Sequence, residues 1–178
     1  EHLSICHIEV QTDPPYGVHV GRTVLETVDG EDLRTRGVFV LADEKAWALH
    51  GAGLKGLGTA PRLELTGGEG AKTLTRLGGA LDALALSGLS RASTVITFGG
   101  GSIADLGGLA ASLFKRGIDV LHCPTTLLAQ VDASVGGKTA INLTLGKNLA
   151  GTIHQPRGVF ADPDVLQTLP PEELASGL

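Results

Sequence analysis

Apolar and polar residues alternate along the chain in blocks that favour strands and helices in turn. The strand-like blocks are short, apolar throughout and rich in β-branched residues. They predict strands at residues 37–43, 62–68, 93–98, 119–124 and 158–162. Between these blocks, apolar residues recur at helical spacing, most clearly as leucines at positions 74, 77, 81 and 84. The spacing predicts helices at 44–57, about 72–89, 102–117 and 125–131, and a first helical turn at the Pro-Pro-Glu-Glu sequence near 168–173.

Two further segments have different patterns. SICHIEV (residues 4–10) and YGVHV (16–20) predict two short strands, and the turn-rich TDPP between them predicts a hairpin. Residues 132–156, DASVGGKTAINLTLGKNLAGTIHQP, contain many Gly, Asn and Thr residues and show little periodicity. We expect this last segment to be an ordered loop.

The alternation of strands and helices predicts the fold class. Strands that are apolar throughout are typical of a parallel sheet covered by helices on both faces. We therefore expect a Rossmann-like α/β fold with an N-terminal β-hairpin, in which residues 1–178 form a single nucleotide-binding domain. Ligands of such sheets bind at the carboxyl ends of the strands. The residues that follow the predicted strands are Asp43, Gly67-Gly68-Glu69, Gly99-Gly100-Gly101, Thr125-Thr126 and Asp162.

The stretch TFGGGSIADLGG (97–108) places three glycines between a predicted strand and a helix that begins near Ser102. Glycine allows close approach of a ligand, and the free N–H groups at a helix start attract anions. The turn therefore favours a pyrophosphate site, with a tight turn that binds nothing as the alternative. Asp105, one turn into the helix, is either a ligand-binding carboxylate or an exposed acid favoured by the helix dipole.

Two lysines of the 132–156 segment, Lys138 and Lys147, lie beside glycines, each within four residues of Asn142 or Asn148. Ammonium and amide groups on a glycine-bearing loop favour an anionic ligand. A plain surface loop is the alternative. Arg116 ends a predicted helix, where a cation also complements the helix dipole.

Composition and charge limit the classes of partner. The net charge of −5 argues against a nucleic-acid-binding surface, so positive charge for an anionic ligand must be local. No apolar stretch reaches the roughly 18 residues of a membrane span, and no basic and apolar leader begins the sequence. We expect a cytoplasmic protein without a membrane partner. Cys6 and Cys123 have no paired spacing, and we expect both to be reduced thiols.

Three blocks resemble the N-terminal, nucleotide-binding domain of the 3-dehydroquinate synthase family: GGGSIADLGGLAASLFKRG, CPTTLLAQVDASVGGKTAINLTLGKNLAGTIHQP and VLQTLPPEELASGL. The resemblance runs from about Asp43 to Leu178. It implies a lyase of the shikimate pathway that converts 3-deoxy-D-arabino-heptulosonate 7-phosphate to 3-dehydroquinate and phosphate. It also implies NAD, a divalent metal (zinc or cobalt), a phosphorylated sugar-acid substrate and, for the full-length enzyme, a homodimer.

The resemblance assigns roles residue by residue. It implies cofactor binding by Asp43, Glu69, Lys72, Gly100, Gly101, Ser102, Asp105, Thr125, Thr126, Lys138, Lys147, Thr168 and Leu169. It implies substrate-binding and catalytic roles for Asp132, Lys138, Asn148 and Arg116, with Arg116 reaching a neighbouring subunit.

The same resemblance implies no metal ligand in this chain. The family's ligands are a glutamate two residues past the SGL ending and two histidines of a helical C-terminal domain, which this sequence does not contain. We expect His122 and His154 to be structural, and the chain alone to bind NAD without turnover. Ala104 departs from the family, which usually has glycine there, and we expect its methyl group to be tolerated in the helix but to tighten the approach of the pyrophosphate.

Three other functions stay open. Sugar-phosphate cyclases that form inosose or valiolone products share most of these motifs. Polyol dehydrogenases share the GGGS turn and the PTT block, but typically have a lysine at the position of Gly108 and lack the SVGGKTAIN segment. A non-catalytic NAD-binding module is the third alternative.

Overall fold

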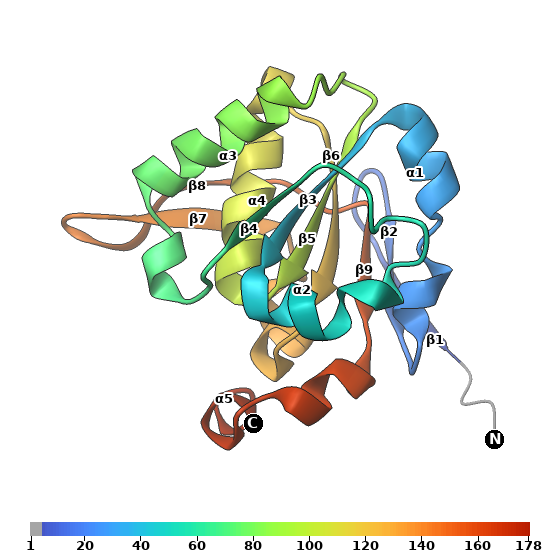
Figure 1. Cartoon of the computed structure of the whole chain (residues 1–178). Helices are drawn as coiled ribbons and strands as arrows, with labels where there is room; N and C mark the ends of the chain where they lie inside the picture. The colour runs from blue at the N-terminus through green and yellow to red at the C-terminus, as the bar shows by residue number, and fades with distance from the viewer. Residues whose placement is uncertain (1–4) are drawn as a thin grey trace.

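A seven-stranded sheet forms the centre of the molecule, in the order β1-β2-β9-β6-β5-β3-β4 (Figure 1). The computed structural model describes residues 5–178, apart from the side chain of Glu31. The strands of this sheet are β1 (Cys6–Val10), β2 (Tyr16–Val20), β3 (Val38–Asp43), β4 (Arg62–Leu65), β5 (Thr94–Gly99), β6 (Asp119–Pro124) and β9 (Gly158–Ala161). The α-helices are α1 (Gly30–Arg36), α2 (Glu44–His50), α3 (Leu74–Leu86), α4 (Gly101–Leu113) and α5 (Pro171–Ala175). The short helical turns are η1 (Val24–Thr27), η2 (Gly51–Gly53), η3 (Glu69–Ala71), η4 (Phe114–Arg116), the π-helical η5 (Ala129–Ala133) and η6 (Pro163–Thr168).

The sheet is parallel except for its first pair, which confirms the predicted fold class. Strands β1 and β2 form the expected antiparallel hairpin, and β2 then pairs parallel to β9. Ser4, the first residue of the predicted first strand, lies outside the described residues. Every helix among the described residues is too short or too polar to cross a membrane.

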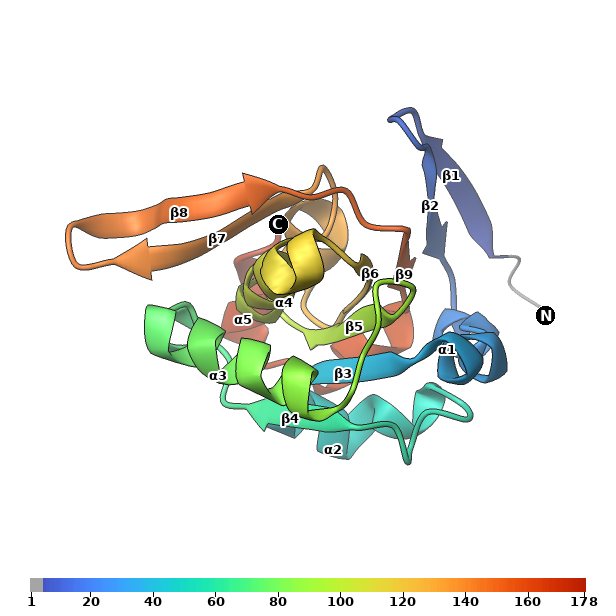
Figure 2. The same cartoon turned by 90° about the horizontal axis from the view of Figure 1, so that it is seen from above.

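Helices cover both faces of the sheet because successive strand residues point to opposite sides. On β5, Val95 packs with the apolar residues of α3 and α4, whereas Ile96 and Phe98 pack with those of α1 and the α2 region. Figure 2 shows α3 and α4 on one side of the sheet and α1 and α2 on the other. Helix α2 ends at His50 and continues only as the short turn η2, so the predicted 44–57 helix is too long.

The order of the strands changes direction between β3 and β5. The chain leaves β3 for β4 on one side and then returns past β3 to form β5 on the other. The connections after β3 and β5 therefore diverge at their carboxyl ends, where parallel α/β sheets bind ligands. Asp43 ends β3 and the triple glycine begins at the end of β5, so this switch point lies between two of the predicted sites.

The predicted loop at 132–156 is wrong. Its residues form a second sheet of two antiparallel strands, β7 (Lys138–Leu143) and β8 (Gly146–Ile153), which lies along α4 (Figure 2). This hairpin packs closely on the helix because Gly108 has no side chain: a Cβ there would lie 2.6 Å from Cγ2 of Thr139. On the other side of the helix, a Cβ at Gly107 would lie 2.4 Å from Cγ2 of Thr97 in the main sheet. The absence of side chains at these two glycines thus allows α4 to pack closely between the two sheets.

Candidate nucleotide and substrate site

Asp43 ties together three segments at the carboxyl edge of the sheet. One carboxylate oxygen caps α2 by accepting hydrogen bonds of 2.9 Å from the N–H groups of Lys45 and Ala46. The other accepts a 2.9 Å bond from the N–H of Gly67, after β4. The side chain is therefore oriented before any ligand arrives. Oδ2, which accepts only the bond from Gly67, still has acceptor capacity for a hydroxyl group.

The triple glycine forms the turn into α4, as predicted. Gly100 is the N-cap, and its carbonyl accepts the N–H groups of Ile103 and Ala104. The N–H groups at the very start of an α-helix have no partner within the helix, which makes them suitable for an anion. Neighbouring side chains also require glycine here: a Cβ at Gly99 would lie 2.8 Å from Cγ1 of Ile103. Packing alone thus accounts for part of the glycine cluster.

Ala104 lies inside the molecule. Ala104 is 4% exposed and belongs to the buried face of α4. The extra methyl group therefore packs against the protein, away from the solvent-facing start of the helix. Thr125 is also buried, and the hydroxyl oxygen of Thr126 accepts a 3.3 Å hydrogen bond from Ala129, which begins η5.

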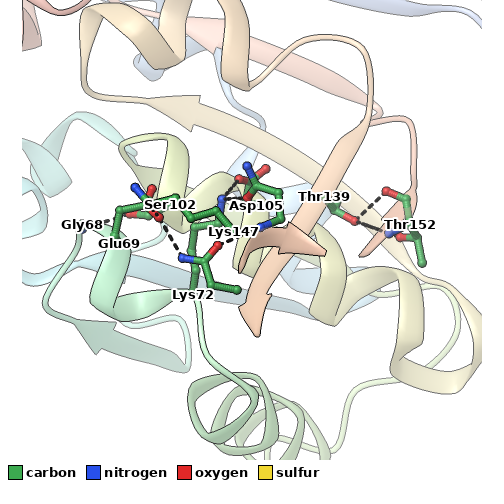
Figure 3. A network of polar contacts seen from close by, with 10 residues as sticks. Gly68, Glu69, Lys72, Ser102, Asp105, Thr139, Lys147 and Thr152 are labelled. Atoms are coloured by element: carbon green, nitrogen blue, oxygen red, sulfur yellow. Dashed lines mark hydrogen bonds and ion pairs between the residues drawn. The ribbon is translucent and has the colours of Figure 1, made fainter. Parts of the chain in front are cut away.

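Lys72 and Asp105 form a largely buried ion pair at the centre of the site (Figure 3). Nζ of Lys72 donates to Oδ2 of Asp105 at 2.5 Å and also to Oδ1 of Asn148 on β8. The Asp105 side chain is 18% exposed, so the alternative of a solvent-facing acid is wrong. Burial raises the pKa of Asp105 above its usual value, although Lys72 acts in the opposite direction.

Asn142 connects the hairpin to the residues that follow β4. It lies at an irregularity in the pairing of β7 with β8, where its backbone N–H leaves the ladder and donates to the Lys72 carbonyl at 2.8 Å. Its side-chain amide donates to Glu69 at 2.8 Å and accepts a 2.9 Å bond from the N–H of Asn148. Sequence reasoning noted this residue as an amide group but did not include it among the site residues.

Glu69 and Lys147 lie at the exposed rim of this network (Figure 3). Nζ of Lys147 is 3.6 Å from Oε2 of Glu69. The hydrogen bond from Asn142 lowers the pKa of Glu69, burial acts in the opposite direction, and the Lys72 and Lys147 ammonium groups lower the pKa further. The N–H of Gly68 donates to the hydroxyl of Ser102 at 3.0 Å, which joins the turn after β4 to the start of α4.

A cleft of about 550 Å³ opens beside the buried pair. Asp105, Asp132, Lys138 and Asn148 are among the residues that line it. Nζ of Lys138 is 3.9 Å from Oδ1 of Asp132, and both side chains are largely exposed. Lys138 lies on β7 and Lys147 on β8, contrary to the predicted loop. Both side chains are largely exposed, so their ammonium groups can turn toward a ligand.

Three predicted residues lie away from this cleft. Arg116 follows the far end of α4, about 20 Å along the helix axis from the glycine turn. It is exposed, and its backbone has a left-handed φ of 67°. Thr168 and Leu169 follow β9 at the end of η6, where the Thr168 hydroxyl lies 2.6 Å from Nε2 of His50. His50 is a polar residue of this region that sequence reasoning missed.

His122, His154 and the two cysteines lie in ordinary structural environments. His122 is buried on β6, with Nδ1 2.7 Å from the hydroxyl of Thr97, and burial lowers its pKa to about 4. Nε2 of His154 is 2.8 Å from the carbonyl oxygen of Ile118. Both cysteines are free thiols, and burial raises the pKa of Cys123 to about 12. Within residues 5–178, no three His, Cys, Asp or Glu side chains gather as a metal site.

Comparison with known proteins identifies the family to which this chain belongs. The family model for the 3-dehydroquinate synthase N-terminal domain matches residues 62–176. The 3-dehydroquinate synthase of Opitutus terrae is 49% identical over 150 residues, which are 83% of this chain and 42% of that protein. The chain thus spans less than half the length of that curated relative.

Two solved cyclases share the fold. One is a 2-deoxy-scyllo-inosose synthase in complex with carbaglucose-6-phosphate, NAD⁺ and Co²⁺, which is 30% identical, has a TM-score of 0.85 and matches 97% of this chain and 49% of its own. The other is the 2-epi-5-epi-valiolone synthase of Streptomyces hygroscopicus with NAD⁺ and Zn²⁺, which is 29% identical, has a TM-score of 0.81 and matches 96% and 49%. The family model spans the turn after β4, the glycine turn, the buried Lys72–Asp105 pair and the β7–β8 hairpin, and the chain therefore belongs to the 3-dehydroquinate synthase family, as part of its N-terminal domain.

Proposed function

We propose that this chain is the NAD-binding domain of a 3-dehydroquinate synthase, in which residues 1–178 form one nucleotide-binding unit. The observation that carries the proposal is the buried Lys72, which bonds at once to Asp105 on α4 and to Asn148 on β8. It joins the helix that follows the glycine turn to the hairpin with Lys138 and Lys147, so that groups for a dinucleotide and groups for a sugar acid belong to neighbouring parts of one site.

The residues at the switch point between β3 and β5 fit NAD. The start of α4 offers N–H groups to a pyrophosphate, and the fixed carboxylate of Asp43 has acceptor capacity for ribose hydroxyls. When bound, NAD would accept a hydride from the substrate and return it within one turnover. The proposed binding set is Asp43, Glu69, Lys72, Gly100, Gly101, Ser102, Asp105, Thr125, Thr126, Lys138, Lys147, Thr168 and Leu169. The NAD⁺ in both similar cyclase structures supports this assignment.

The cleft lined by Asp132 and Lys138 suits a phosphorylated sugar acid. We assign Lys138 to hold an anionic group, because its exposed ammonium lies only 3.9 Å from Asp132 and can exchange that contact for a ligand. Asp132 and Asn148 would bind hydroxyl groups of the same substrate, Asn148 through its side chain beside Lys72. Arg116 lies too far along α4 for this cleft, so we assign it to the substrate phosphate of a neighbouring subunit in a homodimer.

The zinc or cobalt of the proposed enzyme has no fitting donor set in the described part of the chain. We therefore assign the metal to residues outside this sequence and expect the 178-residue chain to lack turnover. The second candidate function is another sugar-phosphate cyclase activity, because the inosose synthase matches 97% of the chain with a TM-score of 0.85.

Titration calorimetry of the chain with NAD tests the cofactor assignment. Lys147→Ala should weaken NAD binding several-fold without unfolding the chain, because its side chain is 72% exposed. Lys55→Ala is the matched control, since Lys55 is also exposed and ion-paired, with Glu26 at 2.6 Å. Absence of NAD binding by the folded chain would overturn the assignment.

Turnover requires a protein that includes the sequence downstream of Leu178. Release of phosphate from the heptulosonate phosphate identifies the synthase, whereas turnover only of a hexose phosphate identifies an inosose-type cyclase. In that protein, Lys138→Ala should abolish turnover while NAD remains bound. Near-normal turnover by this variant would contradict the role of Lys138.

A further inference from the structure

His7 and His19 face each other across the N-terminal hairpin at the edge of the main sheet. They are direct partners in the antiparallel register of β1 and β2, and their Nδ1 atoms are 3.4 Å apart. His7 is exposed and His19 is half-buried, so water and ions reach the pair. Phe160, the partner of His19 on β9, packs on the face of the sheet that α1 and α2 cover. The preceding residue, Val159, packs on the opposite face against Val135, and the cleft lies on that opposite face.

We propose that His7 and His19 bind a Zn²⁺ ion through their Nδ1 atoms. Two nitrogens at the usual Zn–N distance of about 2.0–2.1 Å and a tetrahedral angle of about 109° lie about 3.3–3.4 Å apart. The observed separation is 3.4 Å, so the distance between the two Nδ1 atoms already matches this geometry once the ion replaces the hydrogen bond that joins the two rings. Adjacent ligands of a square-planar ion such as Cu²⁺ lie closer, at about 2.9 Å, so the pair favours a tetrahedral ion.

Neighbouring residues hold both rings in place. The His19 ring stacks on Phe160, with ring centroids 4.8 Å apart and planes 8° from parallel. Gly17 leaves room for the rings to converge, since a Cβ there would lie 2.6 Å from Cε1 of His7 and 2.8 Å from Nε2 of His19.

The site has two protein ligands, because no third His, Cys, Asp or Glu of residues 5–178 joins the pair. Water or a small anion completes the coordination, so the ion stays open to exchange. Its structural effect is to fasten β1 to β2 at the exposed edge of the sheet. Zinc binding should therefore stabilise the folded chain against heat.

Zinc chloride, titrated into the chelator-treated 178-residue chain, tests the proposal by calorimetry. One Zn²⁺ per chain should bind, and His7→Ala or His19→Ala should each weaken binding at least tenfold. Gly17→Ala should also weaken it, although no ligand is removed. Cys6→Ser is the matched control: Cys6 is exposed beside His7, but neighbouring strand residues point to opposite faces, so its loss should change nothing.

Two further readouts separate this site from nonspecific zinc binding. Co²⁺ in place of Zn²⁺ should give the intense visible absorption of a tetrahedral ion without a thiolate charge-transfer band. Zinc should raise the melting temperature of the wild-type chain and not that of the His7→Ala/His19→Ala variant, with circular dichroism confirming that the variant is folded. Unchanged affinity in both single histidine variants, or loss of binding in Cys6→Ser, would overturn the proposal.

Discussion

Nζ of Lys72 lies 2.5 Å from Oδ2 of Asp105, and the lysine residue is only 3% exposed. This ion pair joins the turn after β4 to α4, one turn past the start of that helix. A buried charge is strongly disfavoured unless it is paired and hydrogen-bonded, and Lys72 meets this requirement with two side-chain acceptors, Asp105 and Asn148. The pair therefore fixes the geometry of the site before any ligand binds.

Breaking this pair should destabilise the chain. Lys72→Met leaves a largely buried carboxylate without its cation, which costs about 3 kcal/mol of unfolding free energy. A double-mutant cycle with Asp105→Asn should give a coupling energy of about 1–3 kcal/mol in urea unfolding. The control pair, Arg22 with Asp164, has a similar contact of 2.6 Å but is much more exposed, so its coupling should be about 0–1 kcal/mol. Equal coupling in the two pairs would contradict a special role for burial.

Asn142 should control the ionisation of Glu69. Asn142→Ala removes the hydrogen bond that is the main cause of the lowered pKa of Glu69, so this pKa should rise toward its usual value. Carbon-13 NMR of the glutamate carboxyl during a pH titration measures the change. Lys147→Ala is the comparison, since Lys147 contributes less, and its effect on the Glu69 pKa should be smaller. A larger effect of Lys147→Ala would reverse the assigned order of causes.

The side chain of Asn148 should contribute more to the stability of the chain than the ability of asparagine to adopt a left-handed backbone conformation. Its φ of 57° is left-handed, a conformation that glycine adopts without cost and most other residues adopt at about 1–2 kcal/mol. Asn148→Gly keeps the easy access to the left-handed backbone conformation but removes the side-chain acceptor for Lys72. Asn148→Ala removes the acceptor and also disfavours this backbone conformation. Chemical denaturation should therefore rank the wild type above the glycine variant and that variant above the alanine variant. A glycine variant as stable as the wild type would show that the Lys72 contact contributes little.

The sequence pattern predicted the main sheet and its helices correctly but did not predict the β7–β8 hairpin, and particular residues show the physical reasons. Asp43 and the triple glycine were placed correctly because strand ends in a parallel sheet share one edge. The β7–β8 hairpin was missed because neither of its strands alternates cleanly between apolar and polar residues, and because Gly151 resembles a loop residue while it serves close packing against β7. The Asn142 contacts depend on an irregular strand pairing, which no periodicity reveals.

Gly108 should be required by the hairpin above it. Gly108→Ala adds a Cβ at 2.6 Å from Cγ2 of Thr139, so either the helix or the hairpin must shift, at a cost of about 1–3 kcal/mol. Gly79→Ala in α3 is the matched control, because a Cβ at that exposed helical position meets nothing within 4 Å. That change should stabilise the chain by about 0.5–1 kcal/mol. Thermal unfolding of the two variants should therefore shift in opposite directions, and a shared direction would contradict the packing argument.

His122 should make the chain less stable in mild acid. Its pKa falls from an ordinary 6.5 to about 4 in the folded chain, because burial disfavours the charged imidazolium and His154 adds a smaller effect. Between these two values the unfolded chain binds a proton that the folded chain does not, so stability is lost as the pH falls from about 6.5 to about 4. The full loss from this residue is about 3 kcal/mol, since each pKa unit corresponds to about 1.4 kcal/mol.

The comparison variant is His122→Gln, which keeps a polar group near the Thr97 hydroxyl and does not titrate in this range. Every other titrating group is common to both proteins, so the difference between their urea midpoints isolates His122. The wild-type midpoint should fall relative to that of the variant throughout this interval and level off below it. Parallel midpoints at all pH values would mean that His122 is protonated as readily in the folded chain as in the unfolded one.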